Sequence, residues 1–206
     1  EVNSFDKQPI SITSIMWLDW TAGNFVTTNT RNHNLKVWNA SQASPIDSIK
    51  VKAEGGVTSS ILCPGKMRCM LAAMDGSIAV YDMKNSRVDF KSAAGHTETI
   101  FACKFAPNSP HSFATGSYDG TIKLWATDTF TLNKTLVGNG DIIYCLDWSP
   151  TGKMIATSSY SGLITIWDIE QGRELARYLN HTKATFFVAW NQKDERYILS
   201  SSADCS

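Results

Sequence analysis

The sequence predicts an all-β protein built from one repeated antiparallel unit, and three observations predict it. Bulky aromatic residues recur at intervals of 43, 44 and 42 residues, at Trp38, Tyr81, Trp125 and Trp167. A second aromatic series keeps the same period, with intervals of 88 (two periods), 43 and 42 residues between Trp17, Phe105, Trp148 and Trp190. Within each interval, short β-branched runs are separated by Gly, Pro, Asn or Asp, and no long helical pattern interrupts them. Self-similarity at about 40 to 45 residues, with four strand-like runs per unit, is typical of a β-propeller blade.

The unit between residues 95 and 136 shows the four strands most clearly. Thr99–Phe105 alternates as a strand does, and Ser112–Gly116 is a second extended run. The Asp119-Gly120 dipeptide tolerates the positive φ of a tight turn, so Thr121–Trp125 is predicted to return antiparallel. The more polar run Thr129–Leu136 is predicted to complete the sheet at its outer edge.

The same reasoning divides the rest of the chain. Further strands are predicted at Ser14–Leu18, Phe25–Thr28, Leu35–Trp38, Val57–Leu62, Cys69–Ala73, Ser77–Tyr81, Ile142–Trp148, Met154–Thr157, Leu163–Trp167, Thr185–Trp190 and Tyr197–Ser200. The predicted blades span residues 10–51, 56–91, 95–136, 138–179 and 181–206, the last of them truncated. Because a propeller of this repeat length closes with about four to eight blades, we expect residues 1–206 to be an incomplete fragment, of about five blades, of one propeller.

Composition and charge exclude several classes of protein. With 43% apolar residues the chain can form a core, and 19 basic against 19 acidic residues leave no net charge to attract nucleic acid or a membrane. No apolar run approaches the roughly 18 residues of a membrane-spanning helix, and no targeting segment is visible at the start of the sequence. Five cysteines without a CxxC pair favour a reducing compartment, so we expect a cytoplasmic protein with no cofactor.

One set of spacings is more specific than the period. Gly95-His96, Asp119-Gly120 and Leu124-Trp125 together resemble the WD40 repeat, which opens near Gly-His and closes near Trp-Asp. The interval from His96 to Asp119 is 23 residues, and the interval from His181 to Asp204 is also 23.

The resemblance implies a buried hydrogen-bond chain that joins a His, a Ser or Thr, the turn Asp and the Trp within one blade. The matching residues are His96, Thr115, Asp119 and Trp125 in the third unit, and His181, Ser200 and Asp204 in the fifth, whose Trp would lie beyond residue 206. The other units depart from the pattern, with Asn139, Thr157, Ser161 and Trp167 in the fourth, Thr28, Asn32 and Trp38 in the first, and Leu71, Asp75 and Tyr81 in the second. Because buried polar groups are unfavourable without partners, a complete set is predicted to stabilise its blade.

The resemblance also implies a rim of loop side chains where partners bind. This rim is formed by the residue before the turn Asp and by residues just after Gly-His, here Arg31, Thr97, Tyr118, Tyr160 and Lys183. Tyr and Arg are enriched at interface hot spots, so we expect other proteins or peptides as partners, with no prediction of the oligomeric state. The alternative is that Tyr118 and Tyr160 only cover the turn.

The sequence leaves other functions open, as an enzyme, as an RNA-binding protein or as a metal-binding protein. His96, Asp119 and Ser117 could be drawn as a hydrolase triad, and Glu98 and Asp141 as acid–base candidates in a central channel, but no GxSxG motif is present. The lysines and arginines alternate with apolar residues instead of clustering, which disfavours a propeller that binds RNA. A metal site is disfavoured because His96 and His181 fall in different blades. Some stretches further resemble a long family member, which implies two propellers followed by helical repeats and, by analogy, a trafficking or ciliary assembly, with a ciliary or nuclear location as an alternative.

Overall fold

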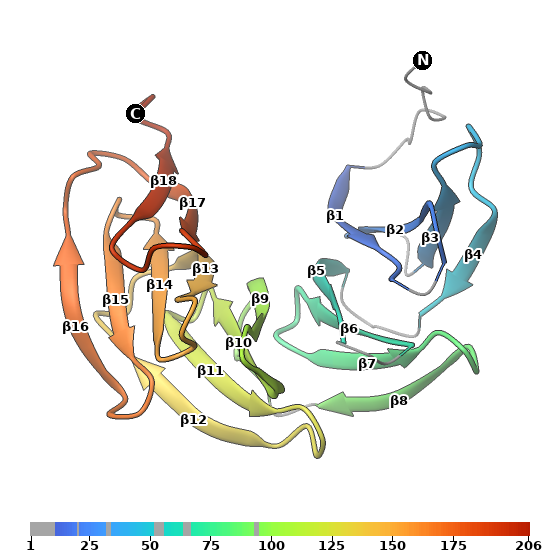
Figure 1. Cartoon of the computed structure of the whole chain (residues 1–206), viewed down its shortest axis with the longest axis horizontal. Coiled ribbons are helices and arrows are strands. Elements are labelled where there is room, and N and C mark those ends of the chain that lie inside the picture. Colours follow the sequence, from blue (N-terminus) through green and yellow to red (C-terminus); the bar gives the residue numbers. More distant parts are fainter. Residues whose placement is uncertain (1–10, 20, 32–33, 52–55, 64–66, 93–94) are drawn as a thin grey trace. The chain divides into compact units, whose positions relative to one another are not determined.

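The chain folds into eighteen β-strands, with no helix among the residues that this computed structural model describes, which are 11–19, 21–31, 34–51, 56–63, 67–92 and 95–206. The strands are shown in Figure 1. Their bounds are β1 Ile12–Trp17, β2 Asn24–Asn29, β3 Asn34–Asn39, β4 Asp47–Lys50, β5 Val57–Leu62, β6 Arg68–Ala73, β7 Ile78–Asp82, β8 Arg87–Ser92, β9 Ile100–Ala106, β10 Ser109–Ser117, β11 Thr121–Ala126, β12 Leu132–Val137, β13 Ile143–Trp148, β14 Met154–Ser159, β15 Ile164–Asp168, β16 Arg173–Tyr178, β17 Thr185–Trp190 and β18 Ile198–Ser202. Within these ranges no helix is long and apolar enough to cross a membrane.

The strands form four antiparallel sheets of four strands each and one sheet of two strands. Each four-stranded sheet is a simple meander, so that the chain order is also the order in space. The chain forms two compact units, of which residues 1–95 carry β1–β4 and β5–β8, and residues 96–206 carry β9–β12, β13–β16 and β17–β18. In the second unit the first strands β9, β13 and β17 lie on one side, and the fourth strands β12 and β16 lie on the other (Figure 1).

The four periodic aromatic residues occupy equivalent places in their sheets. Each lies near the end of a third strand, at 2% to 4% exposure, and faces a buried residue of the second strand across the ladder. The pairs are Trp38 with Phe25, Tyr81 with Cys69, Trp125 with Phe113, and Trp167 with Ile155. The Phe25–Trp38 and Phe113–Trp125 rings stack, at 6.2 and 5.9 Å between centroids. The sequence period is therefore confirmed as one repeated sheet.

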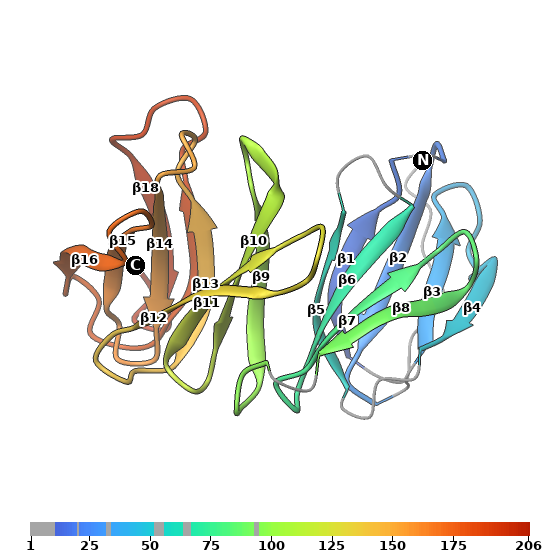
Figure 2. The same cartoon turned by 90° about the horizontal axis from the view of Figure 1, so that it is seen from below.

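The hydrophobic core lies between consecutive sheets. In the second unit, Ile122 and Leu136 of one sheet pack with Leu146 and Ile155 of the next. A further cluster joins Ile166 to Val188 on β17. The second unit's sheets stand side by side in Figure 2. The apolar face of such a blade is buried only if a neighbouring blade packs against it.

Every sheet carries a bulge at the same point of its first strand. The antiparallel register skips one residue of the first strand in all five sheets, namely Thr13, Thr58, Phe101, Tyr144 and Phe186. A bulge leaves one residue unpaired and changes the direction in which its side chain projects. This recurrent feature was not predicted from the sequence.

Most predicted strands are confirmed within one or two residues, but the ends of two are wrong. The strand predicted from Thr129 begins at Leu132 instead, because Phe130 has a positive φ of 54° and belongs to a turn. The strand predicted from Ser112 begins already at Ser109. The assembly of these sheets with further blades into a closed ring stays a prediction.

Candidate functional site

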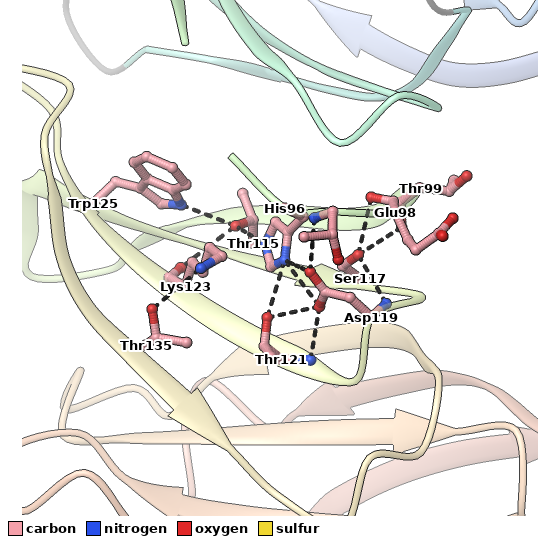
Figure 3. A network of polar contacts seen from close by, with 11 residues as sticks. His96, Glu98, Thr99, Thr115, Ser117, Asp119, Thr121, Lys123, Trp125 and Thr135 are labelled. Carbon is pink, nitrogen blue, oxygen red and sulfur yellow. Dashed lines mark hydrogen bonds and ion pairs between the residues drawn. The ribbon is translucent and has the colours of Figure 1, made fainter. Parts of the chain in front are cut away.

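His96, Thr115, Asp119 and Trp125 come together in the β9–β12 sheet (Figure 3). His96 precedes β9, Thr115 lies on β10, Asp119 lies in the turn after β10, and Trp125 lies on β11. The indole N–H of Trp125 donates to Oγ1 of Thr115 over 2.9 Å. Oγ1 of Thr115 lies 2.8 Å from Nε2 of His96, and Nδ1 of His96 lies 2.9 Å from Oδ2 of Asp119. The four side chains form one continuous chain from the buried indole to the turn after β10.

The two ends of this hydrogen-bond chain fix its direction, because the indole of Trp125 can only donate and the carboxylate of Asp119 can only accept. A carboxylate only accepts, so Nδ1 of His96 donates its proton to Asp119, and Nε2 accepts from the hydroxyl of Thr115. The hydroxyl of Thr115 in turn accepts from Trp125. Every proton is used once, and the imidazole is neutral in this arrangement.

The pKa values of His96 and Asp119 are both lowered, but for different reasons. The His96 side chain is fully buried, and desolvation lowers its pKa to about 4 against the attraction of Asp119. Burial alone would raise the pKa of Asp119, but hydrogen bonds from Thr121 and the contact with His96 outweigh it and lower the pKa. The pair is therefore a neutral imidazole beside an ionised carboxylate at neutral pH.

Three further groups complete this network, and the sequence did not single them out for it. The Thr121 hydroxyl lies 2.6 Å from Asp119 and 3.1 Å from Nδ1 of His96. The backbone N–H groups of Thr121 and Thr97 also donate to Asp119, over 2.9 and 3.1 Å. The sequence does contain a signal for the hydroxyl of Thr121. A hydroxyl residue follows the turn Asp by two positions in both units, as Thr121 after Asp119 and as Ser206 after Asp204.

The partial β17–β18 sheet repeats the network 85 residues further along the chain. Nε2 of His181 lies 2.8 Å from the Ser200 hydroxyl, and Nδ1 lies 3.1 Å from Asp204. Asp204 accepts from the Thr182 N–H over 2.8 Å and from the Ser206 hydroxyl over 2.7 Å, and these bonds hold its pKa below the usual range. The predicted His, Ser and Asp of this unit are thus brought together.

The β13–β16 sheet keeps one end of the network and rebuilds the other. Trp167 still donates to Thr157, over 3.1 Å. Where the turn Asp of the other sheets would be, Ser161 donates its hydroxyl and its N–H to the carboxylate of Asp141, which comes from the segment before β13. Asn139, at the position of the histidine, accepts from the N–H of Asp141. In this sheet the carboxylate therefore comes from the segment before β13 instead of the turn after β14, and no imidazole takes part.

In the first sheet the threonine differs from the one predicted. Trp38 donates to Thr27 over 2.9 Å, whereas the hydroxyl of Thr28 lies 3.0 Å from Thr13. The loop between β2 and β3 is one residue longer than the corresponding loop between β10 and β11, so counting ten residues back from Trp38 reaches the wrong side of the strand. Asn32, the predicted turn residue here, lies outside the described residues.

In the second sheet, the described residues retain the turn part of the network. Asp75 accepts from the N–H and the hydroxyl of Ser77, over 3.0 and 2.5 Å. Leu71 and Tyr81 are both buried in the core of the first unit.

The predicted rim residues are exposed, and four of the five belong to the second unit. Tyr118 is 50% exposed and Tyr160 is 60% exposed, although the backbone N–H of each is bound to a carbonyl just before the first strand of its sheet. Thr97 and Lys183 are also exposed and lie before β9 and β17. Arg31 is exposed in the first unit, where its N–H donates to Asn29.

The family model described as "WD domain, G-beta repeat" matches residues 89–126, which include β9–β11 and the complete network. It also matches residues 130–168, which include β12–β15 and the rebuilt network. Residues 89–126 and 130–168 are therefore similar to WD40 repeats. Similar proteins include the periodic tryptophan protein 2 homolog of Dictyostelium discoideum, 25% identical over 86% of this chain and 19% of that protein. Ribosome assembly protein 4 of Saccharomyces cerevisiae is 35% identical over 46% of this chain and 18% of its own length. Protein transport protein SEC31 of Chaetomium globosum is 26% identical over 65% of this chain and 11% of its own length, so the chain spans less than a fifth of each of these relatives.

The bulge residues of the second unit and the rim tyrosines form a set that we call the aromatic row. Its members are Phe101, Tyr118, Tyr144, Tyr160 and Phe186. The ring of Phe101 is 6.4 Å from Tyr118 and 5.2 Å from Tyr144. The ring of Tyr144 is in turn 6.4 Å from Tyr160 and 5.3 Å from Phe186.

Phe101, Tyr144 and Phe186 were not predicted from the sequence as site residues. Their own separations of 43 and 42 residues were a visible signal, but only the register of the sheets shows that they are bulge residues. In the first unit the two bulge residues are threonines, whose hydroxyls bind backbone carbonyls of Val57 and Ala72.

Ser117 is not arranged as the nucleophile of a hydrolase triad. Its side chain is fully buried, and its hydroxyl donates to the carbonyls of Glu98 and Thr99, at 3.1 and 2.9 Å. It also accepts the N–H of Asp119 over 3.2 Å. Across the described residues, no group of three or more His, Cys, Asp or Glu side chains could hold a metal ion.

Proposed function

We propose that this chain is a non-catalytic scaffold that binds other proteins or peptides through the rim of its second unit. WD40-repeat proteins are in general protein-interaction scaffolds. The observation that carries the proposal for this chain is the aromatic row, in which Tyr118, Tyr160 and Phe186 are each at least half exposed. Exposed aromatic rings on a rigid sheet are the side chains from which interface hot spots are built.

We further propose that the chain is part of a longer, cytoplasmic multi-blade protein of a trafficking or ciliary assembly. The stretches Trp38–Lys52, Asp75–Met83 and Gly95–Phe105 resemble WD repeat-containing protein 17, and one relative is named as a protein transport protein. The coverage of less than a fifth of the relatives supports a longer chain.

The test of the scaffold function separates binding from folding. Tyr118→Ala and Tyr160→Ala should each weaken a defined partner, identified by cross-linking and mass spectrometry, by about tenfold while the melting temperature stays nearly unchanged. The matched control is Tyr178→Ala, because Tyr178 is 48% exposed but lies on the fourth strand β16. Loss of folding in both variants would show that these tyrosines only cover the turn.

An RNA-associated propeller is the second candidate, and the name of one relative, ribosome assembly protein 4, favours it. A contact with phosphates weakens steeply with salt. Purification of the protein at two salt concentrations therefore distinguishes the candidates, since a strongly salt-sensitive yield of nucleic acid would support RNA and a salt-tolerant protein partner would support the scaffold.

A further inference from the structure

The aromatic row combines ring faces with unpaired acidic groups. Glu98 precedes Phe101 by three residues, and Asp141 precedes Tyr144 by three residues. Glu98 is exposed and Asp141 is partly exposed, and within the part of the chain that the structure describes neither forms an ion pair. The third equivalent position, before Phe186, is occupied by Lys183. The acidic groups are thus at the Phe101 and Tyr144 part of the row, and the basic group is at its Phe186 end.

Tyr144 is the centre of this arrangement. Its ring contacts Phe101, Tyr160 and Phe186. Its pKa is raised first by burial and then by the proximity of Tyr160, Tyr118 and Asp141, which shows that three phenols and one carboxylate share one small region. A phenol with a raised pKa stays neutral at physiological pH and keeps the electron-rich face of its ring.

Asp141 is held in place without being neutralised. Its Oδ2 accepts the N–H of Ser161 over 3.1 Å and the Ser161 hydroxyl. Among the described residues no cation neutralises it, and it is partly exposed and close enough to Tyr144 to act on it electrostatically. This favours a cationic occupant and opposes the phosphates of a nucleic acid or an anionic membrane.

We propose that the aromatic row binds a cationic side chain, Arg or Lys, presented by a partner polypeptide. The cation lies over the rings of Phe101, Tyr144 and Tyr160, where the ring quadrupoles attract it, and Asp141 is its counter-ion. Lys183 at the other end of the row repels a second cation, so one basic residue is bound and not a basic run. This inference rests on the proposed scaffold function, for which it names the chemistry of the partner.

The test uses a displayed library of random dodecapeptides and the full protein. Peptides selected by the protein should be enriched in Arg or Lys at one position. For the best synthetic peptide, replacement of that Arg by citrulline, which has the same shape without the charge, should weaken binding by about tenfold, measured by fluorescence anisotropy. Tyr144→Leu, which keeps apolar volume and loses the ring, and Asp141→Asn should each weaken the Arg peptide by about three- to tenfold and the citrulline peptide by much less.

Each outcome of the test has a definite meaning. Tyr178→Ala is the control variant and should leave the affinity unchanged, and thermal melting verifies that each variant is folded. Selected peptides without basic residues, or a citrulline peptide that binds within twofold of the Arg peptide, would overturn the cation proposal while leaving the scaffold function intact, provided that Tyr144→Leu still weakens them. If no peptide is selected, or if peptides bind equally to Tyr144→Leu, the row is not a binding surface and both proposals fail.

Discussion

Gly120 lies against the backbone of Gly140, so that a Cβ placed on Gly120 would be 2.8 Å from the carbonyl carbon of Gly140. This contact joins the turn of one blade to the segment that begins the next. The following turn makes a corresponding contact, because a Cβ on Gly162 would be 2.6 Å from the carbonyl oxygen of Lys183. The glycine of the Asp-Gly turn therefore has two reasons to be glycine, the positive φ of the turn and the close approach of the neighbouring blade.

Gly120→Ala should accordingly lower the free energy of unfolding by about 2 to 4 kcal/mol, from left-handed strain together with steric overlap. Gly152→Ala is the control, since Gly152 also has a positive φ of 71° but its Cβ would be 4.0 Å from the nearest atom. It should lose only about 1 kcal/mol. Urea denaturation measures both values, and an equal loss in the two variants would show that the contact between blades contributes nothing.

His96→Ala should destabilise the protein by about 3 kcal/mol, because it leaves Asp119 and Thr115 buried without their partner. Thr97→Ala is the matched control, since the network uses only the backbone N–H of Thr97 and its side chain is exposed. It should stay within about 0.5 kcal/mol of the parent protein. A His96→Ala protein as stable as the Thr97→Ala protein would remove the structural role of the network.

The lowered pKa of His96 predicts a specific pH dependence of stability. The unfolded chain binds a proton at His96 below about pH 6.5, whereas the folded chain binds it only below about pH 4. Unfolding therefore takes up a proton between these values, and the stabilisation, on the order of 3 kcal/mol, is complete above pH 6.5 and is lost as the pH falls towards 4.

The comparison of the parent protein with His96→Gln isolates this dependence. Asp119 and Lys123 are the charged groups that act on His96, and both are retained in His96→Gln, so the two proteins differ only in the imidazole. The free energy of unfolding of the parent should therefore fall more steeply over this range than that of His96→Gln. Parallel curves would mean that His96 titrates alike in the folded and unfolded states.

The rebuilt network of the β13–β16 sheet predicts that restoring the family residue there is harmful. Ser161→Asp places a carboxylate beside that of Asp141 and removes a donor, so it should cost about 1 kcal/mol. The double change Ser161→Asp with Asp141→Asn should recover most of this loss. A stabilising effect of Ser161→Asp alone, in thermal or urea denaturation, would contradict the assignment of Asp141 as the acceptor.

Residue spacing predicted most of the strands, although β4, β8 and β16 were not predicted, and the side chains of the network were predicted from the resemblance to the WD40 repeat. Thr115 and Trp125 lie on the two strands of one hairpin, and His96 lies in the segment before β9. The same reasoning gave Thr28 in place of Thr27, because one extra loop residue moves the pattern to the opposite face of the strand. Bulges have no such marker in the sequence, so Phe101 and Tyr144 were read as ordinary strand residues and the aromatic row was seen only in part.

The central claim is that His96 is a fixed, neutral member of a structural network and takes no part in acid–base chemistry. Heteronuclear NMR of the imidazole nitrogens over a pH titration tests it most directly. The account predicts a proton on Nδ1, none on Nε2 at neutral pH, and a pKa near 4. A pKa near 6.5, or a proton on Nε2, would contradict it and would make His96 a candidate general acid or base.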